Sequence, residues 1–142
     1  MTPTVGAPQS AAVLVTDGYL DLEFWYPVLR FREAGVDVAI LGPEADSTFY
    51  STLGYPVVPD KSTSEAAENC DLVVIPGGAA AERLAGDEGA VALLSSLVGA
   101  GARVVTIGKG ALVAEAANVP VEAHCQDADG LPQLFRTLLG AD

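Results

Sequence analysis

The residues most able to do chemistry gather in three turns of the sequence. Asp17–Glu23 contains several carboxylates, Pro76–Arg83 contains a Pro-Gly-Gly run and a further carboxylate, and Gly108–Gly110 places Lys109 between two glycines. Carboxylates can transfer protons, lysine can hold an anionic group, and the backbone N–H groups of such turns can stabilise negative charge. These turns therefore favour acid/base chemistry on a small polar molecule, or the binding of such a molecule.

Lys109 and His124 each have two possible roles. Lys109 could be a Schiff-base nucleophile or an anchor for an anionic substrate group. An amine nucleophile needs burial or a neighbouring cation to lose its proton, whereas nearby carboxylates keep it protonated, so the anchor is favoured. Histidine titrates near neutrality, so His124 could carry a proton, although a lone histidine at the end of a strand is more often a surface residue.

The elements that must position these turns are visible as apolar runs. Short runs rich in β-branched residues predict strands over Ala11–Thr16, Val36–Leu41, Leu72–Ile75 and Arg103–Ile107. Because the runs are continuously hydrophobic, the strands should be buried on both faces, as in a parallel sheet. Functional groups of open parallel sheets gather beyond the carboxyl ends of the strands, where we expect the three turns to meet.

Helices alternate with these strands. Apolar residues at helical spacing predict helices over Leu22–Ala34, Glu82–Gly99, Ala111–Ala117 and Leu131–Leu139. Alternating strands and helices predict a doubly wound α/β fold, with helices on both faces of a mostly parallel sheet. The prolines and glycine of Ser47–Glu68 predict a small hairpin or an irregular connection.

Composition limits the class of protein and its partners. The 142 residues are 50% hydrophobic and predict a single domain over residues 11–142, preceded by a flexible tail over residues 1–10. The net charge of −12 repels phosphate backbones and argues against nucleic acid as a partner. The apolar runs are too short to cross a membrane and the first residues do not resemble a secretory signal, so we expect a cytoplasmic protein. Cys70 and Cys125 are too few and too far apart for a disulfide framework or a zinc cluster, and we expect no cofactor.

The order and spacing of the segments resemble the DJ-1/PfpI superfamily, and especially its PfpI-like branch. DGYLDLEFWYPVLRFREAG (Asp17–Gly35) is similar to the first helix region of that family, CDLVVIPGGAAAERL (Cys70–Leu84) to its middle, and VVTIGKGALVAEA (Val104–Ala116) to its nucleophile elbow. The resemblance implies a flavodoxin-like fold, and it implies that Glu23 reaches toward the active site.

Two departures from the family pattern change the expected chemistry. Gly108 stands where the family carries its cysteine, and Lys109 stands where the PfpI branch carries histidine, so the glyoxalase, deglycase and peptidase activities of relatives lack their thiol here. The chain also passes from Asn118 to His124 almost directly, where relatives insert a loop and a hairpin. We therefore expect a shortened C-terminal region and a lower, more open pocket wall.

The resemblance leaves the roles of two glutamates open. Glu23 could act as an acid or base, but a carboxylate in the first turn of a helix is also stabilising without any catalytic role. The PfpI-branch equivalent of Glu82 crosses the dimer interface to hold the elbow histidine. Here Glu82 could pair with Lys109 instead, and such a pair could be merely structural.

Two functions follow as hypotheses. The first is a cofactor-independent acid/base enzyme of the lyase, isomerase, hydratase or cyclase type, acting on a small polar metabolite that is anionic or contains a carbonyl group, with Glu23 and Lys109 as catalytic residues. The second is a catalytically degenerate homodimer that binds a ligand or has a regulatory role. The residues predicted to bind the small molecule are Asp17, Tyr19, Gly77, Gly78, Glu82, Gly108, Gly110 and His124.

The first helix also predicts self-association. Superfamily members are generally homodimers, and here Phe24, Trp25, Leu29 and Phe31 give this helix apolar residues on more than one side. A helix that is apolar around much of its circumference must bury two faces. One face should lie on the sheet and the other on a second copy of the chain.

Overall fold

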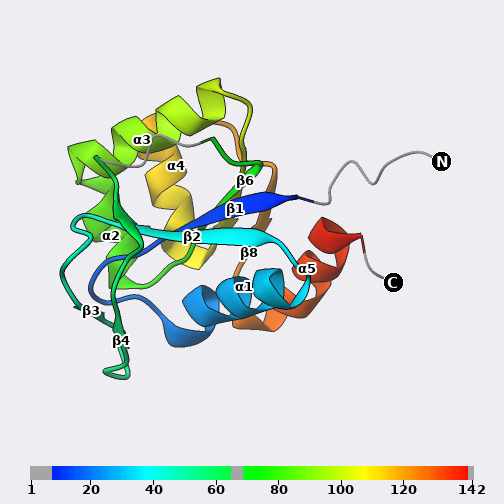
Figure 1. Ribbon diagram of the computed structural model, residues 1–142, viewed down its shortest axis with the longest axis horizontal. Coiled ribbons are helices and arrows are strands. Elements are labelled where there is room, and N and C mark those ends of the chain that lie inside the picture. The colour runs from blue at the N-terminus through cyan, green and yellow to red at the C-terminus, as the bar shows by residue number, and fades with distance from the viewer. Residues whose placement is uncertain (1–7, 65–68, 141–142) are drawn as a thin grey trace.

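A parallel sheet forms the centre of the structure, a computed structural model that describes residues 8–64 and 69–140 (Figure 1). The six strands lie in the order β5-β2-β1-β6-β7-β8, and all five strand pairs are parallel. The strands are β1 (Ser10–Leu14), β2 (Asp37–Gly42), β5 (Lys61–Ser62), β6 (Leu72–Ile75), β7 (Arg103–Ile107) and β8 (Ala123–Cys125). The predicted flavodoxin-like, doubly wound α/β fold is confirmed.

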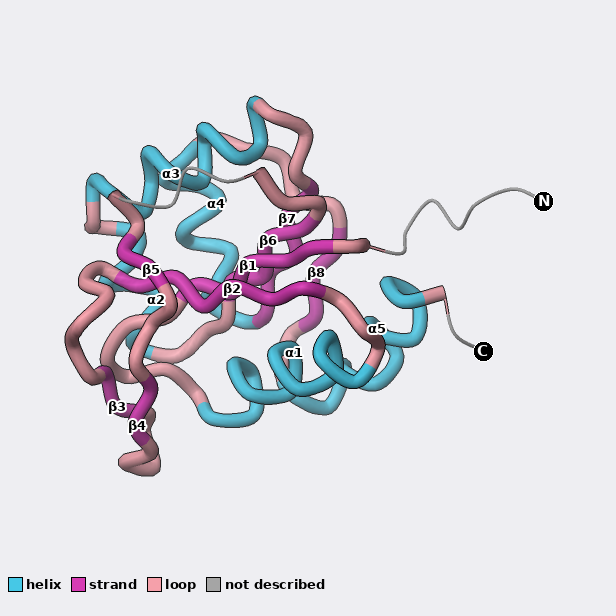
Figure 2. Tube along the Cα trace, in the orientation of Figure 1, coloured by secondary structure: helices cyan, strands magenta, loops and turns pink. Residues whose placement is uncertain are grey.

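Helices cover both faces of this sheet (Figures 1 and 2). One face is covered by α1 (Asp21–Glu33) and α5 (Leu131–Leu139), and the other by α2 (Ala79–Ala85), α3 (Glu88–Gly99) and α4 (Ala111–Ala117). Successive strand residues point to opposite faces, so Val13 belongs to the core under α1 and Leu14 to the core under α3. The strands are apolar throughout because both of their faces are buried.

The four predicted strands are present, and those at Leu72–Ile75 and Arg103–Ile107 have the predicted bounds. The sequence analysis missed β5 and β8. Each is only two or three residues long, and Ala123, His124 and Cys125 of β8 include no β-branched residue. Pairing with an established neighbour, and not an intrinsic preference, makes these segments strands.

The predicted helix over Glu82–Gly99 is wrong as a single element. It consists of two helices, α2 and α3, which are separated at Gly86 and Asp87. The Asp87 side chain accepts hydrogen bonds from the backbone N–H groups of Gly89 and Ala90, which caps the N-terminus of α3. An N-cap residue has non-helical backbone angles, so it ends the preceding helix as it begins the next.

Two connections are built as the sequence suggested. The Ser47–Glu68 region contains an antiparallel hairpin of β3 (Phe49–Tyr50) and β4 (Pro56–Val57), and residues 65–68 of it lie outside the described residues. After α4 the chain turns at Asn118, whose φ is 55°, and reaches β8 within a few residues. A short 3-10 turn, η2 (Ala128–Gly130), then leads into α5.

The last residues of the predicted flexible tail over residues 1–10 are held by the fold. Ser10 is already the first residue of β1, and the backbone N–H of Gln9 donates to Asp71 Oδ2 at 2.7 Å. These contacts anchor the chain ahead of the position where the tail was expected to end. Residues 1–7 of the predicted tail lie outside the described residues.

Candidate functional site

The three predicted turns meet at the carboxyl edge of the sheet, where β1, β6 and β7 end. Between them is a pocket of about 340 Å³, which we call the elbow pocket. Glu23, Gly78, Glu82, Gly108 and Lys109 were predicted and do line it. The other lining residues are Leu20, Ala79 and Gln126.

Glu23 is the most buried charged residue of this pocket. It lies in the first turn of α1, is only 5% exposed, and its Oε1 accepts a hydrogen bond from the backbone N–H of Gly77 at 2.8 Å. Burial raises the pKa of the Glu23 carboxyl, the hydrogen bond from Gly77 opposes that rise, and the charge of Asp127 adds to it. A carboxyl with a raised pKa that still faces a pocket is suited to take up and return a proton.

Two glycines allow the backbone to approach this carboxyl. A Cβ at Gly77 would lie 2.7 Å from Glu23 Oε1, which is closer than real Cβ contacts. Gly108 has a φ of +52°, and a Cβ there would lie 3.6 Å from each carboxylate oxygen of Glu23 and 3.2 Å from the carbonyl oxygen of Gln126. Residue 108 is therefore the position from which a side chain would enter the elbow pocket directly beside Glu23.

Lys109 lies at the rim of the pocket and has a partner. Its Nζ is 3.7 Å from Glu82 Oε1, and both side chains are about 60% exposed. The pairing of Glu82 with Lys109 that the sequence suggested is therefore present, and it forms within one chain. Because the pair is solvated, it contributes little to stability.

Five of the predicted residues do not line the elbow pocket. Gly77 is one of them, and its backbone N–H donates to Glu23 Oε1. Tyr19 is fully buried and its hydroxyl donates to the carbonyl oxygen of Tyr55, whereas Asp17 Oδ1 accepts from the backbone N–H of Tyr50. Both side chains hold the β3–β4 hairpin to the end of β1.

Gly110 and His124 are the other predicted residues that do not line the pocket, and both have contacts within the fold. A Cβ at Gly110 would overlap the carbonyl oxygen of Ile75, so this glycine lets α4 lie against the end of β6. His124 Nδ1 is 2.7 Å from Thr106 Oγ1, and its Nε2 is 3.4 Å from Gln126 Oε1. His124 therefore contacts a pocket residue without itself lining the pocket.

The sequence analysis missed Gln126. Gln126 follows β8, and the hydrophobic pattern did not predict this strand. The position of Gln126 beside Gly108 could therefore not be predicted either. The register pairs Ile107 with Cys125, and this places Gln126 next to Gly108. Had a strand been predicted at residues 123–125, its pairing with β7 would have indicated that Gln126 lies beside the pocket.

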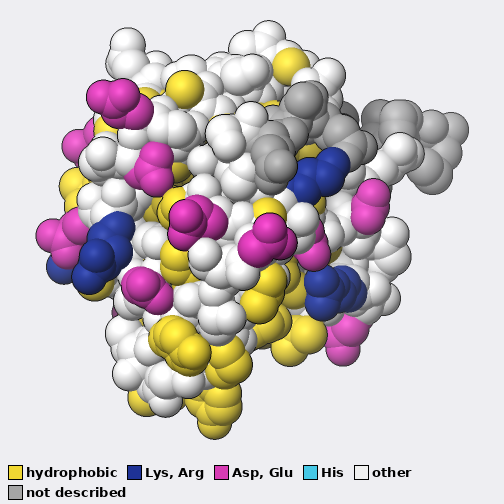
Figure 3. All heavy atoms as spheres, turned by 60° about the vertical axis from the view of Figure 1, so that its left-hand side comes forward, with side chains coloured by type: hydrophobic (Ala, Val, Ile, Leu, Met, Phe, Trp, Pro, Cys, Tyr) yellow, Lys and Arg dark blue, Asp and Glu magenta, His cyan; other side chains and the backbone are white. Residues whose placement is uncertain are grey.

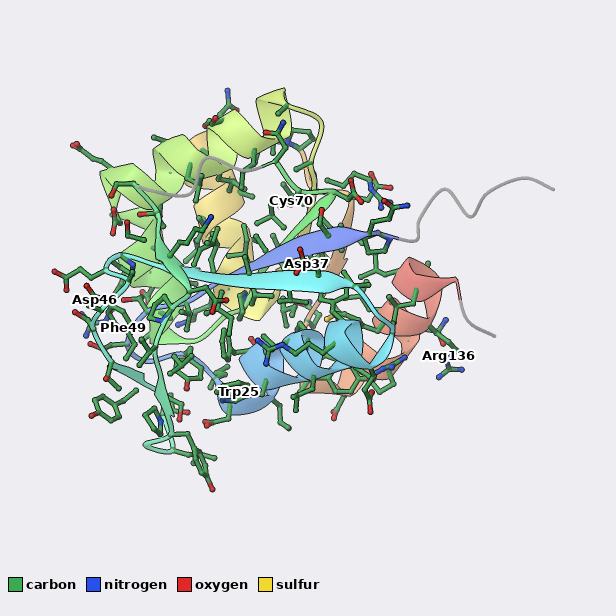
Figure 4. All side chains as sticks on the ribbon, viewed as in Figure 1. Trp25, Asp37, Asp46, Phe49, Cys70 and Arg136 are labelled. Carbon is green, nitrogen blue, oxygen red and sulfur yellow. The ribbon has the colours of Figure 1, made fainter. Side chains whose placement is uncertain are left out.

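Neither cysteine is among the residues that line the pocket, whose lining comes from the described part of the chain. Cys70 lies before β6, at the opposite end of that strand, and Figure 4 shows it far from the β3 residue Phe49. Cys125 is half-buried against the core, and its thiol faces the carbonyl oxygen of Asp127 at 3.5 Å. Burial, together with the charges of Glu23 and Asp127, raises the pKa of the Cys125 thiol, which disfavours the reactive thiolate.

The described residues contain no group of three or more His, Cys, Asp or Glu side chains arranged to hold a metal ion. In the same residues, no helix is both long and apolar enough to span a bilayer.

Comparison with known proteins decides the family. A family model described as "DJ-1/PfpI family" matches residues 9–125. The chain belongs to the DJ-1/PfpI family.

Relatives within the DJ-1/PfpI family agree in fold. The Escherichia coli (strain K12) protein named protein/nucleic acid deglycase 2 is 35% identical over 98 residues, which is 68% of this chain and 57% of that protein. The crystal structure of Drosophila melanogaster DJ-1beta is 25% identical with a TM-score of 0.72, covering 78% of this chain and 61% of that one. A mutant DJ-1 superfamily protein from Salmonella typhimurium matches with a TM-score of 0.77 at 23% identity, over 94% of this chain and 92% of that one.

The DJ-1/PfpI relatives differ from this chain in length. The chain spans about half the length of the curated relatives that it matches. Family membership therefore gives the fold, whereas the reaction must be argued from the residues of the elbow pocket.

Proposed function

We propose that the protein is a cofactor-independent acid/base enzyme in which Glu23 transfers a proton of a small polar metabolite. The observation that carries this proposal is the position of the Glu23 carboxyl, which is 5% exposed, held by the N–H of Gly77, and still part of the pocket lining. Burying a carboxyl group costs free energy, and a purely structural first-turn glutamate could remain in solvent.

The reaction class follows from the groups available. Glu23 can remove a proton from one atom of the substrate and return it to another, which suffices for a lyase, isomerase, hydratase or cyclase reaction. Lys109 lies at the pocket rim, where its ammonium could stabilise negative charge on a substrate carbonyl oxygen. The cysteine-dependent chemistry implied by relatives is disfavoured because Gly108 supplies no thiol.

The decisive variant is Glu23→Gln. Glutamine keeps an acceptor for the Gly77 N–H but cannot take up a proton, so kcat should fall by about 100-fold or more. Substrates would first be sought by thermal shift among small carbonyl compounds and then assayed with both proteins. Glu122→Gln, at an exposed position, is the matched control. Turnover unchanged in Glu23→Gln would remove the proposal.

A second function, ligand binding without turnover, is supported by a different observation. Gly108, in the segment that resembles the family's nucleophile elbow, has no side chain to react, and the Lys109–Glu82 pair at the rim is largely solvated. A degenerate enzyme would bind its ligand in the elbow pocket and release it unchanged.

Restoring the family residues tests whether the elbow pocket is otherwise intact. We expect Gly108→Cys with Lys109→His to gain cysteine-dependent deglycase-type activity, because a Cβ at residue 108 would lie 3.6 Å from each carboxylate oxygen of Glu23. Gly108→Ser with Lys109→His is the control for the sulfur. No gain of activity would show that the pocket has diverged beyond its nucleophile.

We further propose that the protein is a homodimer with a small-molecule ligand as its other partner. The large hydrophobic side chains that are exposed lie mainly on α1 and on the β3–β4 hairpin. Figure 3 shows apolar side chains gathered at the end of the molecule that the hairpin forms.

A further inference from the structure

The rim of the elbow pocket carries one charge of each sign. Glu82 on α2 and Lys109 on the 3-10 turn η1 (Gly108–Gly110) both line the pocket, and both side chains are about 60% exposed. Among the described residues that line the pocket, Lys109 is the one basic side chain. A ligand that enters from solvent therefore meets an ammonium group and a carboxylate group next to each other.

The two charged groups attract each other without forming a hydrogen bond. Lys109 Nζ is 3.7 Å from Glu82 Oε1, whereas a charge-assisted N–H···O hydrogen bond is about 2.7–2.9 Å long. The N–H donors of the ammonium group and the acceptor oxygens of the carboxylate are therefore not used by each other. An exposed ion pair of this kind takes little free energy to open, so both groups can pair with a ligand instead.

The pair discriminates among ligands by their charge. A purely anionic ligand at Lys109 is repelled by Glu82, and a purely cationic ligand at Glu82 is repelled by Lys109. An uncharged ligand would remove water from both side chains and supply no opposite charge to either. A ligand that has both an ammonium group and a carboxylate group pairs with both side chains, so it replaces one ion pair by two.

We propose that the elbow pocket binds a small zwitterion, whose ammonium group pairs with Glu82 and whose carboxylate pairs with Lys109. This inference rests on the proposed function, in which the elbow pocket holds the substrate, and it narrows the substrate to a class that includes the α-amino acids. Both charges of an α-amino acid are attached to one carbon, so they can reach two side chains whose charged atoms are 3.7 Å apart. The anionic group that the sequence analysis expected of the substrate is thereby joined by an ammonium group.

This placement directs the rest of the ligand toward Glu23. The Glu23 side chain comes from α1 and is 5% exposed, so it lies deeper in the pocket than the pair at the rim. Leu20 and Ala79 also line the pocket and offer apolar contact to the hydrocarbon part of a ligand. The charged groups of the zwitterion are therefore held at the rim while its other atoms extend toward the group that transfers protons.

Four probes of nearly the same shape test the ligand class. At pH 7, L-alanine carries both charges, L-alaninamide only the ammonium group, L-lactate only the carboxylate, and L-lactamide neither. Titrations followed by ¹⁵N NMR give the four Kd values, at about 0.15 M ionic strength to screen the general negative charge of the protein. We expect L-alanine to bind at least about fivefold more tightly than each of the others and to shift the amide signals of Gly78 and Gly108.

Single variants identify the two side chains. Glu82→Gln removes the partner of the ammonium group, so L-alanine should bind no more tightly than L-lactate. Lys109→Gln removes the partner of the carboxylate, so L-alanine should bind no more tightly than L-alaninamide. Glu33→Gln and Arg30→Gln are the matched controls, because these two residues form an ion pair on α1 at 3.2 Å and do not line the pocket. Both controls should retain the preference for L-alanine.

The titrations can contradict the inference in several ways. Similar affinities of the wild type for the four probes, tighter binding of any probe other than L-alanine, or no saturable binding of L-alanine up to about 0.1 M would overturn it. A preference that survives Glu82→Gln or Lys109→Gln, or that either control abolishes, would also overturn it.

Failure of this inference is distinguishable from failure of the proposed function. The titrations measure binding alone, whereas the proposed function is tested by the turnover of Glu23→Gln. A preference for L-alanine together with unchanged turnover in Glu23→Gln would reject the acid/base enzyme and keep the pocket as a site for zwitterions. Turnover that depends on Glu23 without this preference would keep the enzyme and reject the ligand class.

Discussion

Glu23 is a charged side chain placed where the fold makes its charge unfavourable. Its carboxyl lies between the turns that contain Gly77 and Gly108, and the Gly77 N–H is its hydrogen-bond donor. Burial is the largest cause of its raised pKa. The energetic consequence is that the folded protein holds the Glu23 proton more tightly than the unfolded chain does.

This difference predicts how stability depends on pH. Because the folded-state pKa of Glu23 is raised, its contribution to stability is fully present below the usual glutamate pKa and is lost as pH rises through the raised value. Glu23→Gln resembles the protonated form, so the free energy of unfolding of the variant, relative to wild type, should increase across that interval. Urea unfolding at a series of pH values measures it.

Glu122→Gln, at an exposed position, is the control for removing one negative charge. A flat difference for Glu23→Gln would mean that Glu23 titrates alike in the folded and unfolded chains. That result would remove the electrostatic argument for its role as a proton carrier.

At the scale of elements, the predictable part of the fold was the part that sequence pattern encodes locally. The runs at Leu72–Ile75 and Arg103–Ile107 are long and β-branched enough to identify their strands, and the family motifs located the elbow between β7 and α4. By contrast, β8 forms through pairing with β7. The break between α2 and α3 at Gly86 and Asp87 depends on the N-cap at Asp87, which in the sequence is only a short gap in a helical pattern. Contacts made across the fold decide such elements.

The candidate site followed the same division. Glu23 and Gly108 were expected together, because both follow motifs at strand ends, and the structure places a Cβ at residue 108 at 3.6 Å from the carboxylate. Tyr19 and Gly110 were expected in the pocket for the same reason, yet they are buried in the framework around it. The position of a residue after a strand predicts that it lies at the carboxyl edge of the sheet. Whether its side chain points into the pocket depends on how it packs against the rest of the fold.

Gly110 gives a prediction at this scale. A Cβ there would overlap the Ile75 carbonyl oxygen, so Gly110→Ala should push α4 away from β6 and lower the free energy of unfolding by about 3 kcal/mol or more. Gly99→Ala in α3 is the matched control. Its Cβ would meet no heavy atom within 4 Å, and alanine favours a helix over glycine by up to about 1 kcal/mol. Similar urea midpoints for the two variants would contradict the packing role of Gly110.

At the scale of the whole molecule, charge and apolar exposure are unevenly placed. The net charge of −12 makes copies of this protein repel one another in general. Leu22 and Leu29 on α1 are nevertheless 65% and 53% exposed, and Leu53 in the hairpin turn is 74% exposed. Leu22 and Leu29 are seven residues apart and therefore lie on one face of the helix.

The α1 face and the hairpin belong to the same region of the surface. Asp21, next to Leu22, has its Oδ1 at 3.4 Å from Thr52 Oγ1, and Thr52 is next to Leu53. The free energy falls when a second molecule covers a group of solvent-exposed apolar side chains. We therefore place the interface of the proposed dimer at this surface, where it would contact the same surface of a second copy.

This interface predicts a change of mass in solution. At micromolar concentration, light scattering after gel filtration should give about twice the mass of one 14.5 kDa chain, and Leu22→Glu with Leu53→Glu should give the monomer, because each interface would then bury uncompensated carboxylates. Leu112→Glu introduces the same group at a side chain on α4 that is 38% exposed, and it should leave the dimer intact. A monomeric wild type, or a double variant that remains dimeric, would show that this surface does not join two copies.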